Sequence, residues 1–295
     1  MTSTATCRWC GAPLADGERL PGLIRCRACG VGTTDPWPSD AQLDAAYAGP
    51  YRPAAGRFSW FGDALLRRSR GSLAARLDRV APRGPVLDVG SGEGALVSAL
   101  RRRGRAATGI EREPGGAGGD PLAGADPGWA AIVFWHSLEH LPEPAAALRR
   151  ASELLDPGGL LVVAAPNAES LQARAFGGRW LALDPPRHLV HLTGRAVRES
   201  LQQLGLRLER VSYLRGGQVV FGWLHGLVGS LPGHPDLYDA IRRPPARFHE
   251  VSRGGRLAAV AAGVLLLPAA LVCAAFEVAV RRGGTFYVEA RAARR

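Results

Sequence analysis

The sequence predicts an α/β protein with a largely parallel sheet, preceded by a cysteine-rich module and interrupted by an apolar insertion. Three observations support this fold class. A short apolar run, 86–89, leads through a glycine-rich turn into a helical pattern over 95–102, which is the opening of a βαβ unit. Four cysteines form two C-x-x-C pairs near the start, and a stretch without charge, 257–276, precedes the last strand pattern.

The glycine-rich turn has the spacing G-x-G-x-G over Gly90, Gly92 and Gly94. Glycines let the backbone pass close beneath a ligand, and the start of the following helix offers free N–H groups. The spacing differs from the G-x-G-x-x-G of pyrophosphate-binding Rossmann domains. Asp88 precedes the first glycine by two positions, and Glu111 follows the next predicted strand, 106–110, where it could accept hydrogen bonds from ribose hydroxyls. Taken alone, such a turn could also be a tight connection in any α/β protein.

Two later segments add to this pattern. Residues 135–141 read W-H-S-L-E-H-L and residues 155–163 read L-D-P-G-G-L-L-V-V. With the glycine turn, they occur in the order seen in class I S-adenosylmethionine-dependent methyltransferases, and the sequence resembles that family. The resemblance implies a seven-strand Rossmann-like sheet and S-adenosylmethionine as cofactor. The residues that it assigns to the cofactor are Asp88, Gly90, Ser91, Gly92 and Gly94 for the methionine and ribose end, Glu111 for the ribose, and Asp120 for the adenine.

The composition sets broad limits. The chain has 295 residues, 46% of them hydrophobic, which is enough for one full domain with appendages. All 37 basic residues are arginine, and the net charge of +11 favours contact with something anionic. Residues 1–6 are short and polar and do not indicate a signal peptide, so we expect a cytoplasmic protein.

The cysteine pairs predict a structural metal site. Cys7 and Cys10 are separated by fifteen residues from Cys26 and Cys29, and a glycine follows each pair. This spacing fits a tetrahedral zinc ribbon, whose four sulfur ligands leave no open position, so we expect a role in folding and none in chemistry. Unligated thiols or a degenerate zinc knuckle are the alternatives.

The ribbon belongs to a longer N-terminal module, 1–51, which includes Trp37, Tyr47 and Tyr51. It resembles the module of methyltransferases from saccharide and natural-product pathways, which implies packing on the catalytic domain near the substrate cleft. A lead-in, 52–84, follows, with an amphipathic helix predicted over 60–80. The helix resembles the family's lid over the cofactor, and we expect its arginines to form a solvated face; a phosphate clamp is the alternative.

The catalytic core is expected over 85–214. Its further strands are predicted at 131–135, 160–165 and 206–213. Between them, 112–128 is short, rich in glycine and proline, and without periodicity, so the helix expected there must be missing or reduced to a loop. The last strand, at 285–290, is expected to pair antiparallel with the sixth, which makes 215–284 an insertion and leaves 285–295 as the last strand and C-terminus.

Three histidines are candidate catalytic residues. His136 and His140 follow the fourth predicted strand, at the carboxyl end of the sheet where ligands of open α/β folds bind. His188 lies in a later loop, 184–192, that resembles a loop over the active site in the same subgroup. An imidazole could act as general base. The alternative is that these side chains, with Glu139 and His191, only fix their loops.

The insertion contains two apolar pieces, 219–231 and 257–276, with arginines on either side of the second. The second piece is long enough to span a bilayer. A single crossing would leave residue 285 on the wrong side of the membrane, and the first piece is too short to provide a second crossing. We therefore expect a helical hairpin at one leaflet, with arginines at the head groups. A helix pair that packs on the domain or forms a dimer interface is the alternative.

These observations predict a cytoplasmic methyltransferase that is peripheral on the inner face of the membrane. Its acceptor would be a small molecule, a saccharide or a lipid-linked compound, methylated at oxygen with a histidine as base. The alternatives are an RNA methyltransferase that holds phosphates with the ribbon and arginines, a sugar-nucleotide C-methyltransferase, and a non-catalytic binding protein. Nucleic acid is the less favoured partner.

Overall fold

The computed structural model describes residues 5–48, 58, 60–111, 120–214 and 217–294. Its main sheet has six strands in the order β5-β4-β6-β7-β10-β9. The four strands from β5 to β7 are parallel, and β10 runs antiparallel to both of its neighbours. The strands are β4 (Val86–Val89), β5 (Ala107–Ile110), β6 (Trp129–Trp135), β7 (Leu155–Pro166), β9 (Arg207–Ser212) and β10 (Thr285–Arg291).

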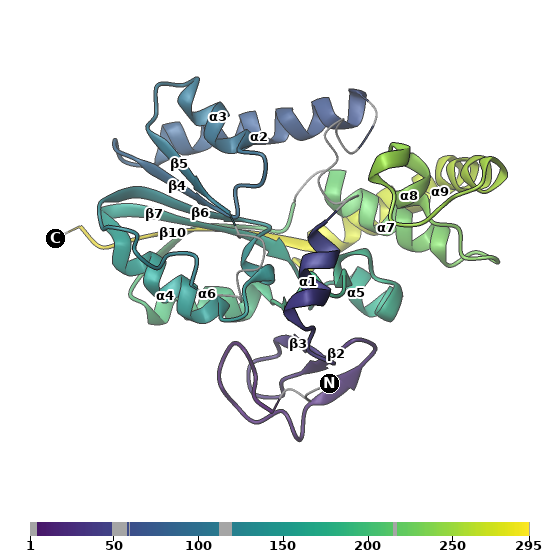
Figure 1. Ribbon diagram of the computed structural model, residues 1–295, viewed down its shortest axis with the longest axis horizontal. Coiled ribbons are helices and arrows are strands. Elements are labelled where there is room, and N and C mark those ends of the chain that lie inside the picture. Colours follow the sequence, from purple (N-terminus) through teal and green to yellow (C-terminus); the bar gives the residue numbers. More distant parts are fainter. Residues whose placement is uncertain (1–4, 49–57, 59, 112–119, 215–216, 295) are drawn as a thin grey trace.

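Helices cover both faces of this sheet (Figure 1). Because successive strand residues point to opposite faces, Leu87 and Val89 pack on one side and Val86 on the other. The first face is covered by α4 (Pro144–Leu154) and α6 (Gly194–Gln203), and the second by α2 (Trp60–Val80) and α3 (Ala95–Arg101). The predicted α/β class is therefore confirmed, with helices on both faces of a parallel-rich sheet.

Among the described residues the main sheet has six strands, whereas the resemblance implied seven. The described residues contain no strand between β5 and β6, although residues 112–119 lie outside the described part of the chain. Residues 120–128 form turns, where Leu122 N donates to Asp120 Oδ1 and Gly124 and Gly128 have positive φ. Prolines and glycines at this density do not support a ladder of sheet hydrogen bonds.

Helix α2 occupies the span predicted for the amphipathic helix, but its arginines are not all solvated. Arg76 donates from Nε and Nη2 to the two carboxylate oxygens of Glu289, at 2.9 and 2.8 Å. Glu289 lies on β10 and is fully buried. This bidentate ion pair fixes α2 to the sheet, so the expectation of a solvated arginine face is wrong at Arg76.

The N-terminal module contains a small sheet and one helix. Its elements are β1 (Glu18–Leu20), β2 (Leu23–Arg25), β3 (Gly32–Thr34) and α1 (Asp40–Tyr47). A strand from much later in the chain, β8 (Val190–His191), completes its sheet, in the order β1-β2-β3-β8. Gly32 pairs with His191 and Thr33 with Val190. Thr34 Oγ1 also donates to His188 O at 2.6 Å. The module is thus hydrogen-bonded to the loop that carries His188.

The insertion forms α7 (Gly217–Gly229), α8 (Leu237–Ile241) and α9 (Arg253–Ala279), of which α9 packs against both others. Its connection to the core is polar and buried. Glu277 of α9 is fully buried and accepts hydrogen bonds from Gln172 N, Gln172 Nε2 and Trp223 Nε1 at 2.9 to 3.0 Å. Gln172 lies in α5 (Leu171–Phe176), so this network joins α9 and α7 to the core.

Candidate functional site

The glycine turn after β4 has free space next to two of its three glycines. Gly90, Gly92 and Gly94 have φ of 79°, 58° and 69°, a region that L-residues with a Cβ rarely adopt. A Cβ at Gly90 would overlap the side chain of Ser137, which follows β6, whereas Cβ atoms at Gly92 and Gly94 would meet no atom within 4 Å. The loop therefore packs tightly against β6 at its first glycine and leaves space for a ligand above the other two.

Two carboxylates border this space. Glu111, at the end of β5, accepts a hydrogen bond from Gly92 N at 2.5 Å. Asp88, on β4, is 4% exposed, and burial raises its pKa to about 7; the charge of Glu111 adds to this rise and the Arg70 guanidinium opposes it. Ser91 N donates to Ile110 O at 3.0 Å, which fixes the loop to β5. The two carboxylates can accept hydrogen bonds from hydroxyl and ammonium groups, and the open glycine backbone lets a ligand approach closely. Together they fit a nucleoside that carries both kinds of group.

Asp120 makes no hydrogen bond to Asp88, Glu111 or the glycine turn among the described residues. Its side chain is exposed, and Oδ1 accepts a hydrogen bond from Leu122 N at 2.9 Å. That bond holds the turn which brings Leu122 into the core. Because 112–119 lie outside the described residues, the assignment of Asp120 to the adenine stays a prediction.

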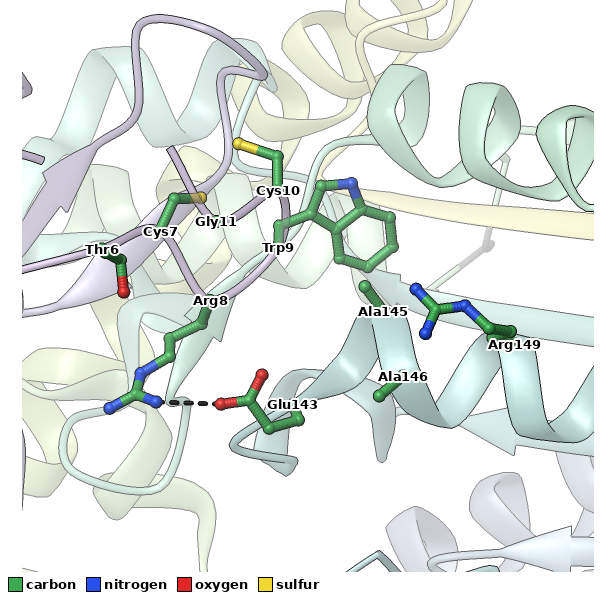
Figure 2. Close-up of a pocket in the computed structure, with 10 residues that line it drawn as sticks. All are labelled: Thr6, Cys7, Arg8, Trp9, Cys10, Gly11, Glu143, Ala145, Ala146 and Arg149. Carbon is green, nitrogen blue, oxygen red and sulfur yellow. Dashed lines mark hydrogen bonds and ion pairs between the residues drawn. The ribbon is translucent and has the colours of Figure 1, made fainter. Parts of the chain in front are cut away.

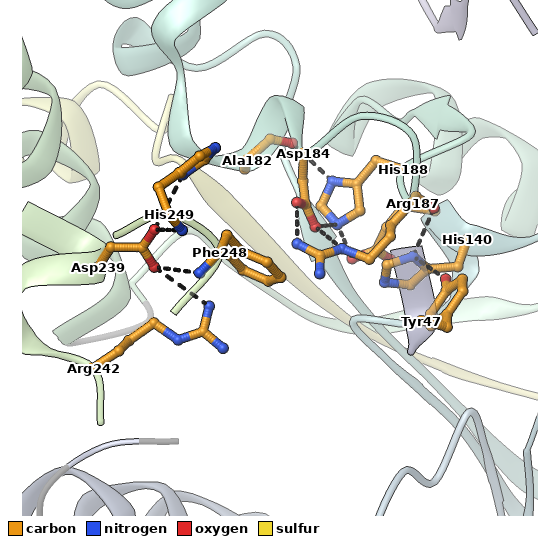
Figure 3. Close-up of polar contacts among 11 residues, drawn as sticks. Tyr47, His140, Ala182, Asp184, Arg187, His188, Asp239, Arg242, Phe248 and His249 are labelled. Carbon is orange, nitrogen blue, oxygen red and sulfur yellow. Dashed lines mark hydrogen bonds and ion pairs between the residues drawn. The ribbon is translucent and has the colours of Figure 1, made fainter. Parts of the chain in front are cut away.

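The three candidate histidines meet around one buried carboxylate, and Figure 3 shows two of them, His140 and His188, next to each other. Glu139 is 2% exposed and lies in the 3-10 turn Leu138–His140 after β6. Its Oε1 is 3.6 Å from His136 Nδ1 and 4.0 Å from His188 Nε2. The rings of His140 and His188 meet edge to face with centroids 4.7 Å apart. The sequence segments 135–141 and 184–192 therefore form one cluster.

Backbone carbonyls fix which nitrogen carries the proton in two of these rings. His140 Nδ1 is 2.8 Å from Arg187 O, and His188 Nδ1 is 2.8 Å from Ala182 O. A carbonyl oxygen can only accept, so each Nδ1 is protonated in the neutral ring and each Nε2 keeps its lone pair. Burial, with the neighbouring His188, lowers the pKa of His140 to about 4, so its ring is neutral at physiological pH.

Glu139 is charged in this neutral surrounding. Burial alone would raise its pKa, but the imidazoles of His136, His140 and His188 outweigh burial and lower it to about 2. Neither carboxylate oxygen of Glu139 has a hydrogen-bond partner among the described residues, and the buried Nε2 of His136 has none either. Orphaned polar atoms of this kind indicate a missing partner, such as a substrate hydroxyl. Glu139, His140 and His188 lie close enough to hold a metal ion as well.

The backbone at His136 has an unusual conformation. Its φ is 53°, in the left-handed region that non-glycine residues rarely adopt, and strained residues of this kind cluster at functional sites. Its neighbour Ser137 donates to Val89 O at 2.5 Å and packs against Gly90. The histidine cluster therefore adjoins the glycine turn, where a methyl donor and an acceptor would have to meet.

Several participants were not predicted from the sequence. Tyr47 OH, from α1, lies 2.9 Å from His140 Nδ1, and Arg187 forms an ion pair with Asp184 beside His188. Phe248 of the insertion lies over the Arg187 guanidinium at 4.4 Å (Figure 3). These contacts join residues far apart in the chain, and no local spacing signals them. His191, in contrast, is buried against Thr34 Oγ1 at 3.0 Å, which supports the interpretation that it fixes the loop.

The four predicted metal ligands also come together. Cys7 Sγ is 3.6 Å from Cys29 Sγ, and Cys10 Sγ is 3.7 Å from Cys26 Sγ. Four sulfurs at about 2.3 Å from a tetrahedral zinc would be about 3.8 Å apart, so the cluster is compatible with zinc. The thiols interact strongly: hydrogen bonding between Cys7 and Cys29 lowers the pKa of Cys7 and raises that of Cys29, so the support for a metal site comes from the sulfur geometry.

A cavity of about 380 Å³ lies between this module and α4 (Figure 2). It is bounded by Trp9 and Arg149, and by an ion pair of 2.9 Å between Arg8 and Glu143. None of the candidate histidines or glycine-turn residues lines it. We therefore regard it as the seam between module and core and not as the substrate site.

The sheet order, with an antiparallel strand between its neighbours, and the open glycine turn beside two acids define a nucleoside-binding fold of the methyltransferase type. The methyltransferase domain family matches residues 65–211. A ubiquinone biosynthesis O-methyltransferase of Xylella fastidiosa (strain 9a5c) is 31% identical over 177 residues, covering 48% of this chain and 70% of that protein. The chain therefore belongs to the class I S-adenosylmethionine-dependent methyltransferases, and S-adenosylmethionine is the cofactor of this family.

Two further similarities have lower coverage or lower identity. The enzyme of the same name from Xanthomonas campestris pv. campestris (strain B100) is 31% identical over 133 residues, covering 37% of this chain and 56% of that protein. The crystal structure of a SAM-dependent methyltransferase from Archaeoglobus fulgidus is 16% identical and covers 79% of this chain and 99% of that chain, with a TM-score of 0.46.

Proposed function

We propose that this enzyme methylates an oxygen of a small-molecule acceptor, a saccharide or a lipid-linked compound, in the cytoplasm and at the inner face of the membrane. The observation that carries this proposal is the buried Glu139 with its three surrounding histidines, directly beside the glycine turn. A hydroxyl acceptor needs a base, and this cluster holds the strongest candidates. The names of the curated relatives, which are O-methyltransferases, support the same acceptor atom.

S-adenosylmethionine supplies an electrophilic methyl group on a sulfonium. In the proposal, Glu111 binds its ribose, Asp88 faces its methionine end, and the backbone of Gly90, Ser91, Gly92 and Gly94 passes beneath it. Asp120 remains the proposed adenine contact. Cys7, Cys10, Cys26 and Cys29 hold a structural zinc, which keeps the module folded against β8.

His136 is the proposed base. Its Nδ1 faces Glu139, which would hold that proton and orient the ring, so that Nε2 can accept a proton from the acceptor hydroxyl. His140 and His188 have their Nδ1 protons committed to carbonyls, and His188 Nε2 lies 4.0 Å from Glu139 Oε1 and 3.6 Å from Asp184 Oδ2, so we assign these two rings to positioning. Transfer then depends mainly on positioning and on exclusion of water.

The test uses S-adenosylmethionine with a ¹³C-labelled methyl group and a metabolite extract from a strain that lacks the gene. We expect the label in a small molecule or lipid, with the carbon chemical shift of an O-methyl group. Label on carbon, nitrogen or nucleic acid would contradict the proposal, as would a lack of cofactor binding in calorimetry.

Substitutions assign the base within the same assay. His136→Gln is expected to lower the rate by about 100-fold or more, while leaving the affinity for the cofactor unchanged. The matched control is His234→Gln, because His234 is exposed and lies in the insertion. An unchanged rate in His136→Gln, with a large loss in His140→Gln, would move the role of base to His140.

A further inference from the structure

Helix α9 has small residues inside and large apolar residues outside. Its buried positions include Ala259, Gly263, Ala270 and Ala274, which face α7 and α8. Its large exposed side chains form one stripe, which we call the outer face: Leu257, Val260, Val264, Leu265, Leu267, Leu271, Val272 and Phe276. Leu265 is 80% exposed and Val272 70%. A surface helix in water normally buries its large apolar residues and exposes polar ones. An exposed apolar face of this size therefore indicates a binding surface.

The buried side of α9 is already packed against α8 and hydrogen-bonded through Glu277. Gly263 lets Leu237 of α8 approach, since a Cβ there would lie 3.3 Å from Leu237 Cδ1. Glu277, the only acidic residue of α9, is turned inward and bound by Gln172 and Trp223. The outer face therefore carries no negative charge, and α9 cannot turn it inward without breaking the Glu277 network.

Arginines stand at both ends of the outer face. Arg253 and Arg256 precede it and Arg281 and Arg282 follow it, and all four are exposed. At about 1.5 Å per residue, the 27 residues of α9 extend about 40 Å. We propose that α9 lies in the plane of a membrane, with its outer face among the acyl chains of one leaflet and its terminal arginines at anionic head groups.

A second copy of the chain fits this surface less well. A two-fold dimer places the same face on both partners. Parallel pairing of two α9 helices would bring Arg253 beside Arg253, and antiparallel pairing would bring Arg253 and Arg256 beside Arg281 and Arg282. Both arrangements juxtapose like charges, whereas anionic lipid complements them.

Helix α9 is also long and apolar enough to cross a bilayer, but the topology opposes crossing. The strands before and after the insertion, β9 and β10, are neighbours in one sheet. A chain that crossed once in α9 would have to return through α7, whose thirteen residues are too few for the hydrocarbon core. If α9 lies in the plane of the membrane, no second crossing is needed.

Docking would place the mouth of the active site at the lipid surface. The insertion leaves β9 and enters β10 at the carboxyl edge of the parallel strands, where the glycine turn and the histidines lie. It contacts α2 through an ion pair of 3.6 Å between Arg243 and Asp63, and the His188 loop through Phe248 and Arg187. An acceptor with a lipid tail could therefore present its head group while its tail stays in the leaflet.

The test is flotation of the zinc-loaded full-length protein with vesicles of phosphatidylcholine, with and without phosphatidylglycerol. We expect the protein to float, more strongly with phosphatidylglycerol and less at high salt. Leu265→Ser with Val272→Ser should lower the partition coefficient by about tenfold or more per residue. Arg281→Gln with Arg282→Gln should lower it by about fivefold per arginine, with anionic vesicles only.

The matched control is Arg102→Gln with Arg103→Gln, because these arginines are also adjacent and exposed but follow α3, away from the insertion. The control should float like the unchanged protein, and calorimetry should show equal cofactor binding for all variants. The proposal is overturned if the unchanged protein stays at the bottom, if the α9 variants float equally, or if the same substitutions dissolve a stable dimer. Vesicle binding without cofactor binding would instead contradict the proposed methyl transfer.

Discussion

The buried carboxyl of Asp88 should affect the stability of the protein as well as its affinity for the cofactor. Asp88 is 4% exposed beneath the glycine turn, and burial raises its pKa from 3.8 to about 7. A carboxyl that resists ionisation in the folded state destabilises the protein wherever the unfolded chain is ionised. Asp88→Asn keeps the size of the side chain and removes the charge, so it should stabilise the cofactor-free protein above neutral pH.

The magnitude follows from the rise in pKa. Below pH 3.8 the carboxyl is protonated in both states and contributes nothing. Between pH 3.8 and 7 the unfolded state ionises first, and stability falls by about 1.4 kcal/mol per pH unit, to a loss of about 4 kcal/mol that stays constant above pH 7. Between pH 5 and pH 8 the expected change is about 3 kcal/mol.

Urea unfolding of both proteins at pH 5 and pH 8 measures this change. The difference in unfolding free energy, Asp88→Asn minus unchanged protein, should grow by about 3 kcal/mol between the two pH values, because other titrating groups cancel. The same substitution should weaken cofactor binding by about tenfold or more, since it removes a charged hydrogen-bond acceptor. A difference that stays constant or shrinks with pH would refute the burial argument.

Two further predictions concern the zinc module and the glycine turn. Cys10→Ser removes one of the four sulfur ligands. It should lower zinc affinity by more than the roughly 10- to 100-fold lost when a residue hydrogen-bonded to a metal ligand is changed, and it should lower the melting temperature; mass spectrometry of bound metal and calorimetry check both. Gly90→Ala should destabilise by about 3 kcal/mol, since its Cβ overlaps Ser137, whereas Gly92→Ala should cost about 1 to 2 kcal/mol but abolish cofactor binding. Equal effects of the two glycine substitutions would contradict an open cradle at Gly92.

Local patterns were enough to predict most elements of the fold. The helix over 60–80 and the strands beginning at Val86 and Thr285 have the predicted positions, because amphipathic and apolar periodicity directly determine helix and strand. The pairing of the last strand with the sixth is also confirmed. The glycines and prolines of 112–128 predicted a reduced connection after β5, and the described part of it, 120–128, contains no strand.

Contacts between residues far apart in the sequence could not be predicted from local sequence patterns. The pairing of β3 with the two-residue strand β8 depends on a register more than 150 residues apart in the chain, and two residues carry no periodicity. The same holds for Arg76 with Glu289, and for Tyr47 with His140. For the site, the histidines could be named from their place after β6, but Glu139 at their centre emerges only when both loops are in position.

The sheet shared by the zinc module and β8 has a consequence for any shortened form of this protein. A fragment that starts after the module would lose the strand that pairs with Val190 and His191, and with it Val31, which is fully buried in the main core. The freed edge would present unpaired amide and carbonyl groups to neighbouring molecules, a common origin of aggregation. Truncation would thus disturb the loop that carries His188 and also lower the solubility of the remaining protein.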